Sequence, residues 1–375
     1  MSGAAQESVP DASAATPPGA PVCEAESGAV GGRSRIAIAL NVLGFVLGLA
    51  LLWWCSARAL SASNRDQLAL LWRAPWWQGA SLVGVSLLNA LCSAMVFRSA
   101  VSPVRRLPVL DVVCVNFVAS LGNYMPFKLG LVFRVLTHNR RNGLALLTIG
   151  AWMGAMAVLM LCVLGPVMLA GLWRGRVDGA WWLAAAGGTL MLCTLVVLAA
   201  RFVGGVGGVG AAGTGRGWLL VQRGWAALPM PRGFREKWGV VMLGRVREGT
   251  RMLGSPAAVA QAVAWRIGDL ATQSLRFLIA ATIIGRTLTW DQSILAGSTY
   301  YLIGSVSPTG QLGVREAGTA GIVGKLLVGI DFDAFSLIVL MVTAAELLSL
   351  LLGAGVSMLY LARRPVMAPV PVVAS

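Results

Sequence analysis

Long uncharged runs separated by short arginine-rich segments constrain this chain more than any other feature. Residues 144–172 contain no charged side chain. Similar runs, each with at most one charged residue, cover residues 36–54, 79–97, 181–200 and 334–361. An α-helix needs ~20 apolar residues to cross the ~30 Å hydrocarbon core of a bilayer, and these runs are close to that length or longer. The sequence therefore predicts a polytopic membrane protein.

The composition supports this class and excludes others. Hydrophobic residues make up 57% and charged residues 12% of the chain, whereas soluble domains carry about 25% charged residues. The formal net charge is +15, but the basic residues lie mostly between the apolar runs, as the positive-inside rule describes. We therefore expect no nucleic-acid partner.

Catalytic, metal and cofactor signatures are absent from the sequence. The six cysteines form no CxxC pair, and His138 is the one histidine, so we expect no disulfide framework, no metal site and no cofactor. The glycine pattern at residues 205–210 follows an apolar run rather than a strand, so it indicates a linker and not a dinucleotide site. We expect a protein that is not an enzyme.

Composition along the chain predicts five regions. Residues 1–32 hold four acidic and no basic residues, which indicates a disordered tail. A first transmembrane half at 33–200 and a second at 257–362 flank a basic cytoplasmic loop at 201–256, and 363–375 form a C-terminal tail. The loop has nine basic and two acidic residues. Phe234, Trp238 and Val241 share a helical face there, so the loop is either a basic amphipathic helix on the inner leaflet or a solvated loop.

Two polar signatures interrupt the apolar runs. Residues 120–134 read SLGNYMPFKLGLVFR, and residues 304–316 read GSVSPTGQLGVRE. Pro and Gly break helices, and broken backbone survives in a bilayer only where protein or a water-filled cavity satisfies its polar groups. Paired breaks in two halves of a chain indicate a transporter binding site.

Assigning sides by the positions of Arg and Lys places the first signature on a segment that enters and leaves from the cytoplasm and the second on one that enters and leaves from outside. The predicted fold is an all-α, polytopic transmembrane helix bundle with an inverted repeat, six full spans and two re-entrant helical hairpins broken by Pro and Gly. Counting each hairpin limb as a short span gives about eight to ten spans instead.

Polar residues inside the apolar runs form a candidate network. Arg266, Asp269, Gln273 and Arg276 follow one helical stripe, and Arg266 can pair with Asp269. The pair either holds the bundle together or lines a cavity. Glu346 needs a partner from another helix, because an isolated charge costs roughly 2.5–3.5 kcal/mol at the centre of a membrane helix. The candidate partners are Arg134, Arg315 and Arg266.

The signatures also suit an anionic ligand. Broken helix ends present free N–H groups with partial positive charge, and arginine matches phosphate bidentately. Lys128, Arg134 and Arg315 add full positive charge. A phospholipid or polyprenyl-phosphate head group would fit such a site; the alternative is that Pro and Gly only kink packed helices.

The signatures resemble those of the lysylphosphatidylglycerol synthase transmembrane family, also called the flippase-like domain family, over about residues 36–362. The residues that carry the resemblance are Asn116, Pro126, Lys128, Gly130 and Arg134, followed by Pro308, Gly310, Gly313, Arg315 and Glu316. The resemblance implies a helical membrane domain that binds or moves lipid-linked or aminoacylated lipid substrates. These ten residues are the predicted substrate-binding set, and Arg266, Asp269, Gln273 and Glu346 are the predicted intramembrane polar network.

The chain also differs from the family pattern. Leu131 stands where the family commonly has an acidic residue. The helix that follows often carries an Arg and an acidic residue in the family, but residues 144–165 carry no charge here. Gly310-Gln311 partly replaces a pair of glycines. Too few residues follow position 362 for a soluble transferase domain, so we expect no aminoacyl-transfer chemistry.

The leading hypothesis is a flippase or transporter of lipid or lipid-linked substrates with an anionic head group, in the bacterial inner membrane with both termini in the cytoplasm. Its partners would be membrane or polyprenyl-linked lipids. The alternative is a non-transporting accessory protein that binds a lipid-modifying enzyme or glycosyltransferase through residues 201–256. A membrane-embedded transferase is a third hypothesis, disfavoured by the lack of a nucleophile–base pair.

Overall fold

The structure is a computed structural model that describes residues 33–125, 129–204, 216–227, 232–307, 312–326 and 332–363. The predicted disorder of residues 1–32 and the C-terminal tail from residue 364 lie outside these ranges. The chain divides into two units after Leu40. In the first unit the described residues, 33–40, are helical. All further description concerns the second unit, Asn41–Ser375.

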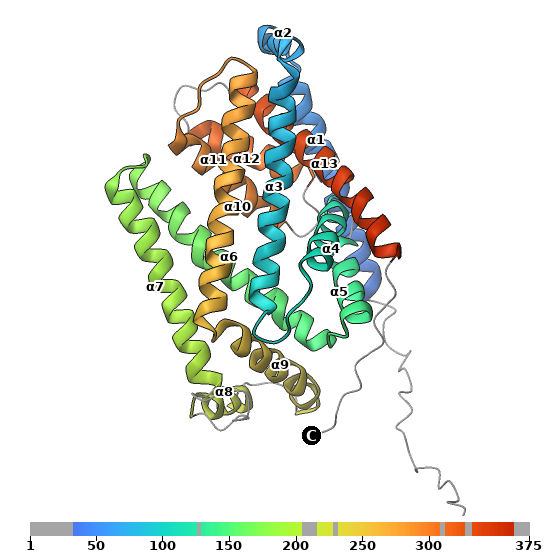
Figure 1. Cartoon of the computed structure of the whole chain (residues 1–375), viewed down its shortest axis with the longest axis vertical. Coiled ribbons are helices and arrows are strands. Elements are labelled where there is room, and N and C mark those ends of the chain that lie inside the picture. Colours follow the sequence, from blue (N-terminus) through green and yellow to red (C-terminus); the bar gives the residue numbers. More distant parts are fainter. Residues whose placement is uncertain are drawn as a thin grey trace, which may run out of the picture. The chain divides into compact units, whose positions relative to one another are not determined.

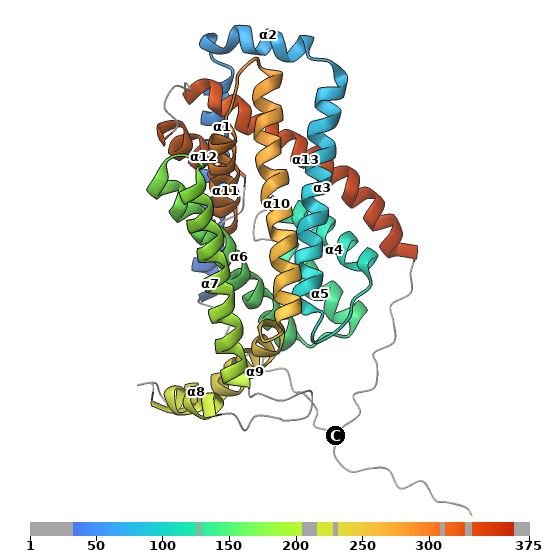
Figure 2. The ribbon, with the colours of Figure 1, turned by 60° about the vertical axis from the view of Figure 1, so that its left-hand side comes forward.

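Every element in the described ranges is a helix, so the all-α prediction is confirmed. The helices are α1 (Arg33–Ala59), η1 (Ala62–Asn64), α2 (Arg65–Arg73), α3 (Trp76–Val101), α4 (Val109–Gly122), α5 (Leu129–Asn142), α6 (Leu146–Arg174), α7 (Gly179–Gly204), α8 (Arg216–Ala227), α9 (Arg232–Leu253), α10 (Pro256–Ile283), α11 (Trp290–Val306), α12 (Val314–Leu326) and α13 (Phe332–Arg363). Figures 1 and 2 show their arrangement.

Five of the described helices are long and apolar enough to cross a membrane: α1, α3, α6, α7 and α13. The sixth predicted span corresponds to α10, which has 28 residues and packs along α3. It is not among the five apolar helices, and it carries the charged side chains of Arg266, Asp269 and Arg276. These three side chains are buried inside the bundle, so α10 presents its charge to protein rather than to lipid.

Both signatures lie at the turns of short helical hairpins. Helices α4 and α5 pack together, as do α11 and α12, and each of the four helices has at most 17 residues. The α4–α5 hairpin joins the bundle at the end where α9 lies, and α11–α12 joins at the end where α2 lies (Figures 1 and 2). Hairpins that enter from opposite ends agree with the predicted re-entrant segments; the inverted repeat stays a prediction.

Two apolar clusters leave a polar layer between them. The first cluster packs the N-terminal part of α3 against the C-terminal part of α10 and includes Leu82, Phe277, Ala280, Phe335 and Val339. The second packs the opposite ends of the same two helices and includes Val96, Ala100, Trp152, Val259 and Ala262. The polar residues of α3 and α10 lie between these clusters along each helix. The fold therefore holds a polar site in the middle of an apolar bundle.

The connection at 201–256 is largely helical. Helices α8 and α9 occupy it, and α9 packs against α6 and α7, so the solvated-loop alternative is wrong for these two segments. Both helices lie across the end of α7 (Figure 2). The side chains of Phe234, Trp238 and Val241 lie outside the described residues, and the position on the inner leaflet stays a prediction.

The turn between α6 and α7 is fixed to the start of α11. Asp178 accepts a hydrogen bond from the backbone N–H of Trp181 at 2.9 Å and pairs with Arg174. These two contacts hold the pKa of the Asp178 carboxyl well below its ordinary value. The N–H of Val177 donates to Asp291 of α11 at 2.9 Å. The second hairpin therefore has a fixed anchor at its entry.

Glycine is required where α4 and α5 meet. A Cβ atom at Gly130 would lie 1.8 Å from the carbonyl oxygen of Ala119, and one at Gly122 would lie 2.7 Å from the backbone nitrogen of Gly130. Neither contact is possible for a real side chain, and backbone atoms cannot move aside cheaply. The two glycines thus let the limbs of the first hairpin touch along their backbones.

We expect Gly130→Ala to lower the free energy of unfolding by about 1–3 kcal/mol, the usual cost of overpacking. Thermal or denaturant unfolding of the purified protein in detergent would measure it. The control is Gly84→Ala in α3, where a Cβ would meet nothing within 4 Å; it should be neutral or stabilise by up to about 1 kcal/mol. Equal stability of the two variants would contradict the close approach.

Candidate functional site

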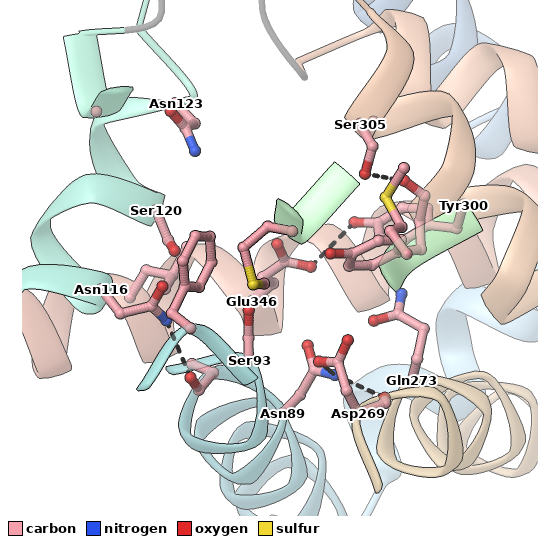
Figure 3. A pocket seen from close by; sticks show the side chains of 18 of the residues that line it. Asn89, Ser93, Asn116, Ser120, Asn123, Asp269, Gln273, Tyr300, Ser305 and Glu346 are labelled. Atoms are coloured by element: carbon pink, nitrogen blue, oxygen red, sulfur yellow. Dashed lines mark hydrogen bonds between the residues drawn. The ribbon is translucent and has the colours of Figure 1, made fainter. Parts of the chain in front are cut away.

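A polar cavity of about 330 Å³ lies between the two apolar clusters. Both hairpins reach it: α4 and α5 contribute Ser120 and Gly130, and α11 and α12 contribute Gly304 and Arg315. Helices α3, α6, α10 and α13 complete the wall. Figure 3 shows Asn116, Ser120 and Asn123 along one side, with Tyr300 and Ser305 on the opposite side. The two signatures therefore meet at one site.

Most of the described candidate residues line this cavity. They are Asn116, Gly130, Arg134, Arg266, Asp269, Gln273, Arg315 and Glu346. Gly313 and Glu316 are buried at the base of α12, in direct contact with the wall rather than in it. The predicted residues Pro126, Lys128, Pro308 and Gly310 lie outside the described residues. A role in substrate binding stays a prediction for the whole set.

Glu346 of α13 is the centre of the charged wall. Its carboxylate accepts from Arg276 of α10 at 2.8 Å and from Arg315 of α12 at 3.0 Å. The hydroxyl of Tyr124, at the tip of the first hairpin, donates to it at 2.7 Å. Of the three partners expected for Glu346, only Arg315 fills that role, and Arg276 is an additional partner. One carboxylate thus joins α10, α12, α13 and the first hairpin.

Arg315 extends this junction through its aromatic neighbours. It donates to the Tyr124 hydroxyl, and its guanidinium lies over the rings of Tyr300 and Tyr124 at 4.0 and 5.0 Å from their centroids. Cation–π contacts of this kind stabilise a desolvated guanidinium. Arg315 of the second signature therefore contacts Tyr124 of the first, and this contact joins the two signatures.

Glu316 fixes the start of α12. Its carboxylate accepts from the N–H of Gly313 at 2.5 Å and from the hydroxyl of Thr343 at 2.9 Å. Gly313 has φ +80°, and a Cβ there would lie 1.7 Å from the carbonyl oxygen of Gly48 in α1. Only glycine can take this conformation so close to another backbone. The Gly–Val–Arg–Glu sequence therefore fixes the start of α12 in the orientation that places Arg315 in the cavity wall.

Arg266 and Asp269 form the ion pair expected from their spacing, at 2.6 Å. Arg266 also donates to the hydroxyl of Tyr301 at 2.6 Å, and Asn89 of α3 donates to Asp269 at 2.8 Å. Because the pair both lines the cavity and links α3, α10 and α11, the two alternatives for its role are not exclusive.

Arg134 has a different environment from the other cavity arginines. It donates to the side-chain oxygen of Asn116 at 2.7 Å and lies 3.7 Å from the ring centroid of Phe97. Across the described ranges, no carboxylate lies within ion-pair distance of it. It is 6% exposed. Because these contacts are neutral, they do not neutralise the positive charge of Arg134, and an anion could pair with it.

A neutral polar stripe on α3 was not predicted. Ser86, Asn89 and Ser93 line the cavity at helical spacing, and Asn116, Ser120 and Asn123 form a second stripe along α4 and its C-cap. The signal was present in the sequence, because polar residues that recur at i, i+3 and i+7 inside an apolar run mark a helix face turned away from lipid. The aromatic residues Tyr124 and Tyr300 gave no such signal.

Unused hydrogen-bond donors remain at the site. In the described part of the chain, the Nε atoms of Arg266 and Arg276 and the Nε2 atom of Gln273 are buried without a partner. Buried donors are costly to leave unpaired. The described part of the wall therefore holds more hydrogen-bond donors than the protein's own acceptors satisfy.

A protein family described as "Lysylphosphatidylglycerol synthase TM region" matches residues 41–366, well over half of the chain. The chain belongs to the lysylphosphatidylglycerol synthase TM region family. The match covers both hairpins and every helix that lines the cavity, so the suspected resemblance is confirmed. No functionally curated protein matches the chain.

The buried Arg266–Asp269 pair makes a testable prediction about this family member. Asp269→Ala leaves a buried, uncompensated Arg266, and we expect the free energy of unfolding to fall by about 3–5 kcal/mol. The double variant Arg266→Leu/Asp269→Leu should lose less than that, because no charge is left unpaired. Denaturant unfolding in detergent would measure both.

The exposed pair Glu248–Arg251 is the matched control, with the same i, i+3 spacing and a 3.3 Å contact. Its single and double alanine variants should each change the free energy of unfolding by about 1 kcal/mol or less. Strictly additive losses for the Arg266 and Asp269 variants would show that the two side chains do not act as a pair.

Proposed function

We propose that this protein binds the anionic head group of a lipid or lipid-linked substrate in the central cavity and moves it across the bilayer. The observation that carries the proposal is Arg134, a buried cavity arginine held by Asn116 and Phe97 rather than by a carboxylate. The family, which is one of flippase-like membrane proteins, supports it. The proposal assigns no bond-making or bond-breaking step.

The position of the cavity suits this task. The buried apolar clusters would lie at the levels of the two halves of the hydrocarbon, and the cavity lies between them where a charged head group meets its highest barrier. Both hairpins contribute residues to its wall, and they join the bundle at opposite ends (Figures 1 and 2). Replacing water by fixed donors there lowers the barrier for an anionic head group specifically.

The distribution of basic residues supports an orientation in the bacterial inner membrane. The end of the bundle that carries α8 and α9 also carries the loop with Arg105 and Arg106. Helix α9 and its flanks add several more arginines. The positive-inside rule assigns this end to the cytoplasm, and we infer that both chain termini lie there.

The test is a head-group accessibility assay with the purified protein in vesicles that contain fluorescent phosphatidylglycerol. We expect Arg134→Gln to slow lipid movement about tenfold or more, because a hydrogen bond to a charged group is worth about 1.5–3 kcal/mol and about 1.4 kcal/mol is tenfold. Protein-free vesicles give the background rate.

Arg140→Gln is the matched control. Arg140 lies on the same helix as Arg134, but it is exposed and is not part of the cavity wall. This variant should move lipid at the wild-type rate. Wild-type movement by Arg134→Gln would exclude the cavity as the path, and an equal loss in both variants would point to general surface charge instead.

A further inference from the structure

We infer that the ligand of the central cavity is a lipid phosphodiester whose head group carries several hydroxyl groups, such as a phosphoinositol or glycosyl phosphate, and not an aminoacylated or other cationic head group. The inference rests on the proposed function and names the substrate class of the same site. Three independent properties of the wall carry it.

The first property is unused neutral hydrogen-bonding capacity. The side chains of Ser93, Ser120 and Asn123 line the cavity, and within the described residues they make no hydrogen bond. Gln273 is 2% exposed and its Nε2 atom has no partner. Hydroxyls and amides both donate and accept, which is what a polyol needs, whereas a bare phosphate offers acceptors only.

Ser120 and Asn123 lie near Asn116, which is the hydrogen-bond partner of Arg134. Ser120 follows Asn116 on α4 by four residues, and Asn123 follows three residues later at the C-cap of that helix. Asn116 itself accepts a hydrogen bond from the Arg134 guanidinium. Ser93 lies on α3 beside them (Figure 3). A phosphate on Arg134 would therefore place hydroxyls attached to it among neutral partners.

The second property is that both carboxylates in the described wall, Asp269 and Glu346, already form ion pairs with arginines. Asp269 pairs with Arg266 and accepts from Asn89. Glu346 pairs with Arg276 and Arg315. An ammonium group would have to displace an arginine, and it would face four cavity arginines against these two carboxylates. A lysyl head group, with two amines, is disfavoured for this electrostatic reason.

The third property is an apolar side to the cavity. Met153, Met156 and Met160 of α6 face the polar walls, and Leu131 of α5 lines the cavity while 39% exposed. Methionine adapts to irregular apolar groups. At about 330 Å³ the cavity is at the low end of ligand pockets, which run from about 300 to 1,000 Å³, so it holds a head group while the chains lie outside. A membrane lipid therefore fits better than a free sugar phosphate.

The experiment is competition for an acyl-labelled fluorescent phosphatidylinositol, followed by anisotropy with the full chain in detergent. The competitors are phosphatidylinositol, phosphatidylmethanol, lysyl-phosphatidylglycerol and inositol 1-phosphate. Phosphatidylmethanol is the matched probe, because it has the same phosphodiester charge and no hydroxyl. We expect phosphatidylinositol to compete at about tenfold lower concentration than phosphatidylmethanol, since each hydrogen bond contributes a factor of about two to ten.

Two variants separate the polyol from the phosphate. Ser93→Ala/Ser120→Ala should bring the two lipids to nearly equal affinity and leave phosphatidylmethanol unchanged. Arg134→Gln should weaken both lipids alike. Ser102→Ala, at the end of α3 and outside the cavity wall, should change neither.

The outcomes distinguish the two proposals. Equal competition by phosphatidylmethanol and phosphatidylinositol in the wild type, or tighter binding of lysyl-phosphatidylglycerol, would overturn the polyol assignment while a loss in Arg134→Gln still supported an anionic head-group site. Equal potency of inositol 1-phosphate and phosphatidylinositol would overturn the lipid assignment. No specific binding of any lipid, with Arg134→Gln like the wild type, would overturn the proposed function itself.

Discussion

The ion pairs around Glu346 are the interaction on which the rest of this structure depends. Burying a charge in an apolar bundle costs several kcal/mol unless another charge and further hydrogen bonds compensate it. Glu346 receives Arg276, Arg315 and the hydroxyl of Tyr124 from three separate elements. Removing any one partner would leave a buried charge or hydroxyl without its full set of contacts. These contacts therefore hold α10, both hairpins and α13 in one arrangement.

This dependence divides the cavity into two parts with different properties. The part made by α10, α12 and α13 has its carboxylates paired with arginines within the protein, although the Nε atoms of Arg266 and Arg276 and the Nε2 atom of Gln273 lack a partner among the described residues. The part made by α3, α4 and α5 has Arg134 with neutral partners and several side chains whose hydrogen bonds are unused in the described residues. A ligand gains most where the protein has not already satisfied its own groups. We therefore propose the first hairpin as the part of the wall that binds the ligand, although Leu131 departs from the family pattern there.

The two halves of the site were not equally predictable from the sequence. Arg266 and Asp269 could be paired in advance, because three residues of helix bring side chains together. The partners of Glu346 could not be chosen, since Arg276, Arg315 and Tyr124 come from segments far apart in the chain, and Arg276 was not among the candidates. The stripe of Asn89 and Ser93 was missed although its spacing was visible. The sequence does not decide the secondary structure of residues 201–256, because a basic segment with scattered apolar residues fits either a helix or a loop.

The sequence by itself determined the membrane class, the helical fold, the position of the two helix breaks and the family, because these follow from local properties: apolar run length, charge distribution and the placement of Pro and Gly. Only the tertiary structure decided which charges neutralise one another and which remain available to a ligand. That decision depends on distances between helices remote in sequence, such as those that give Glu346 two arginines and leave Arg134 with an amide and a ring.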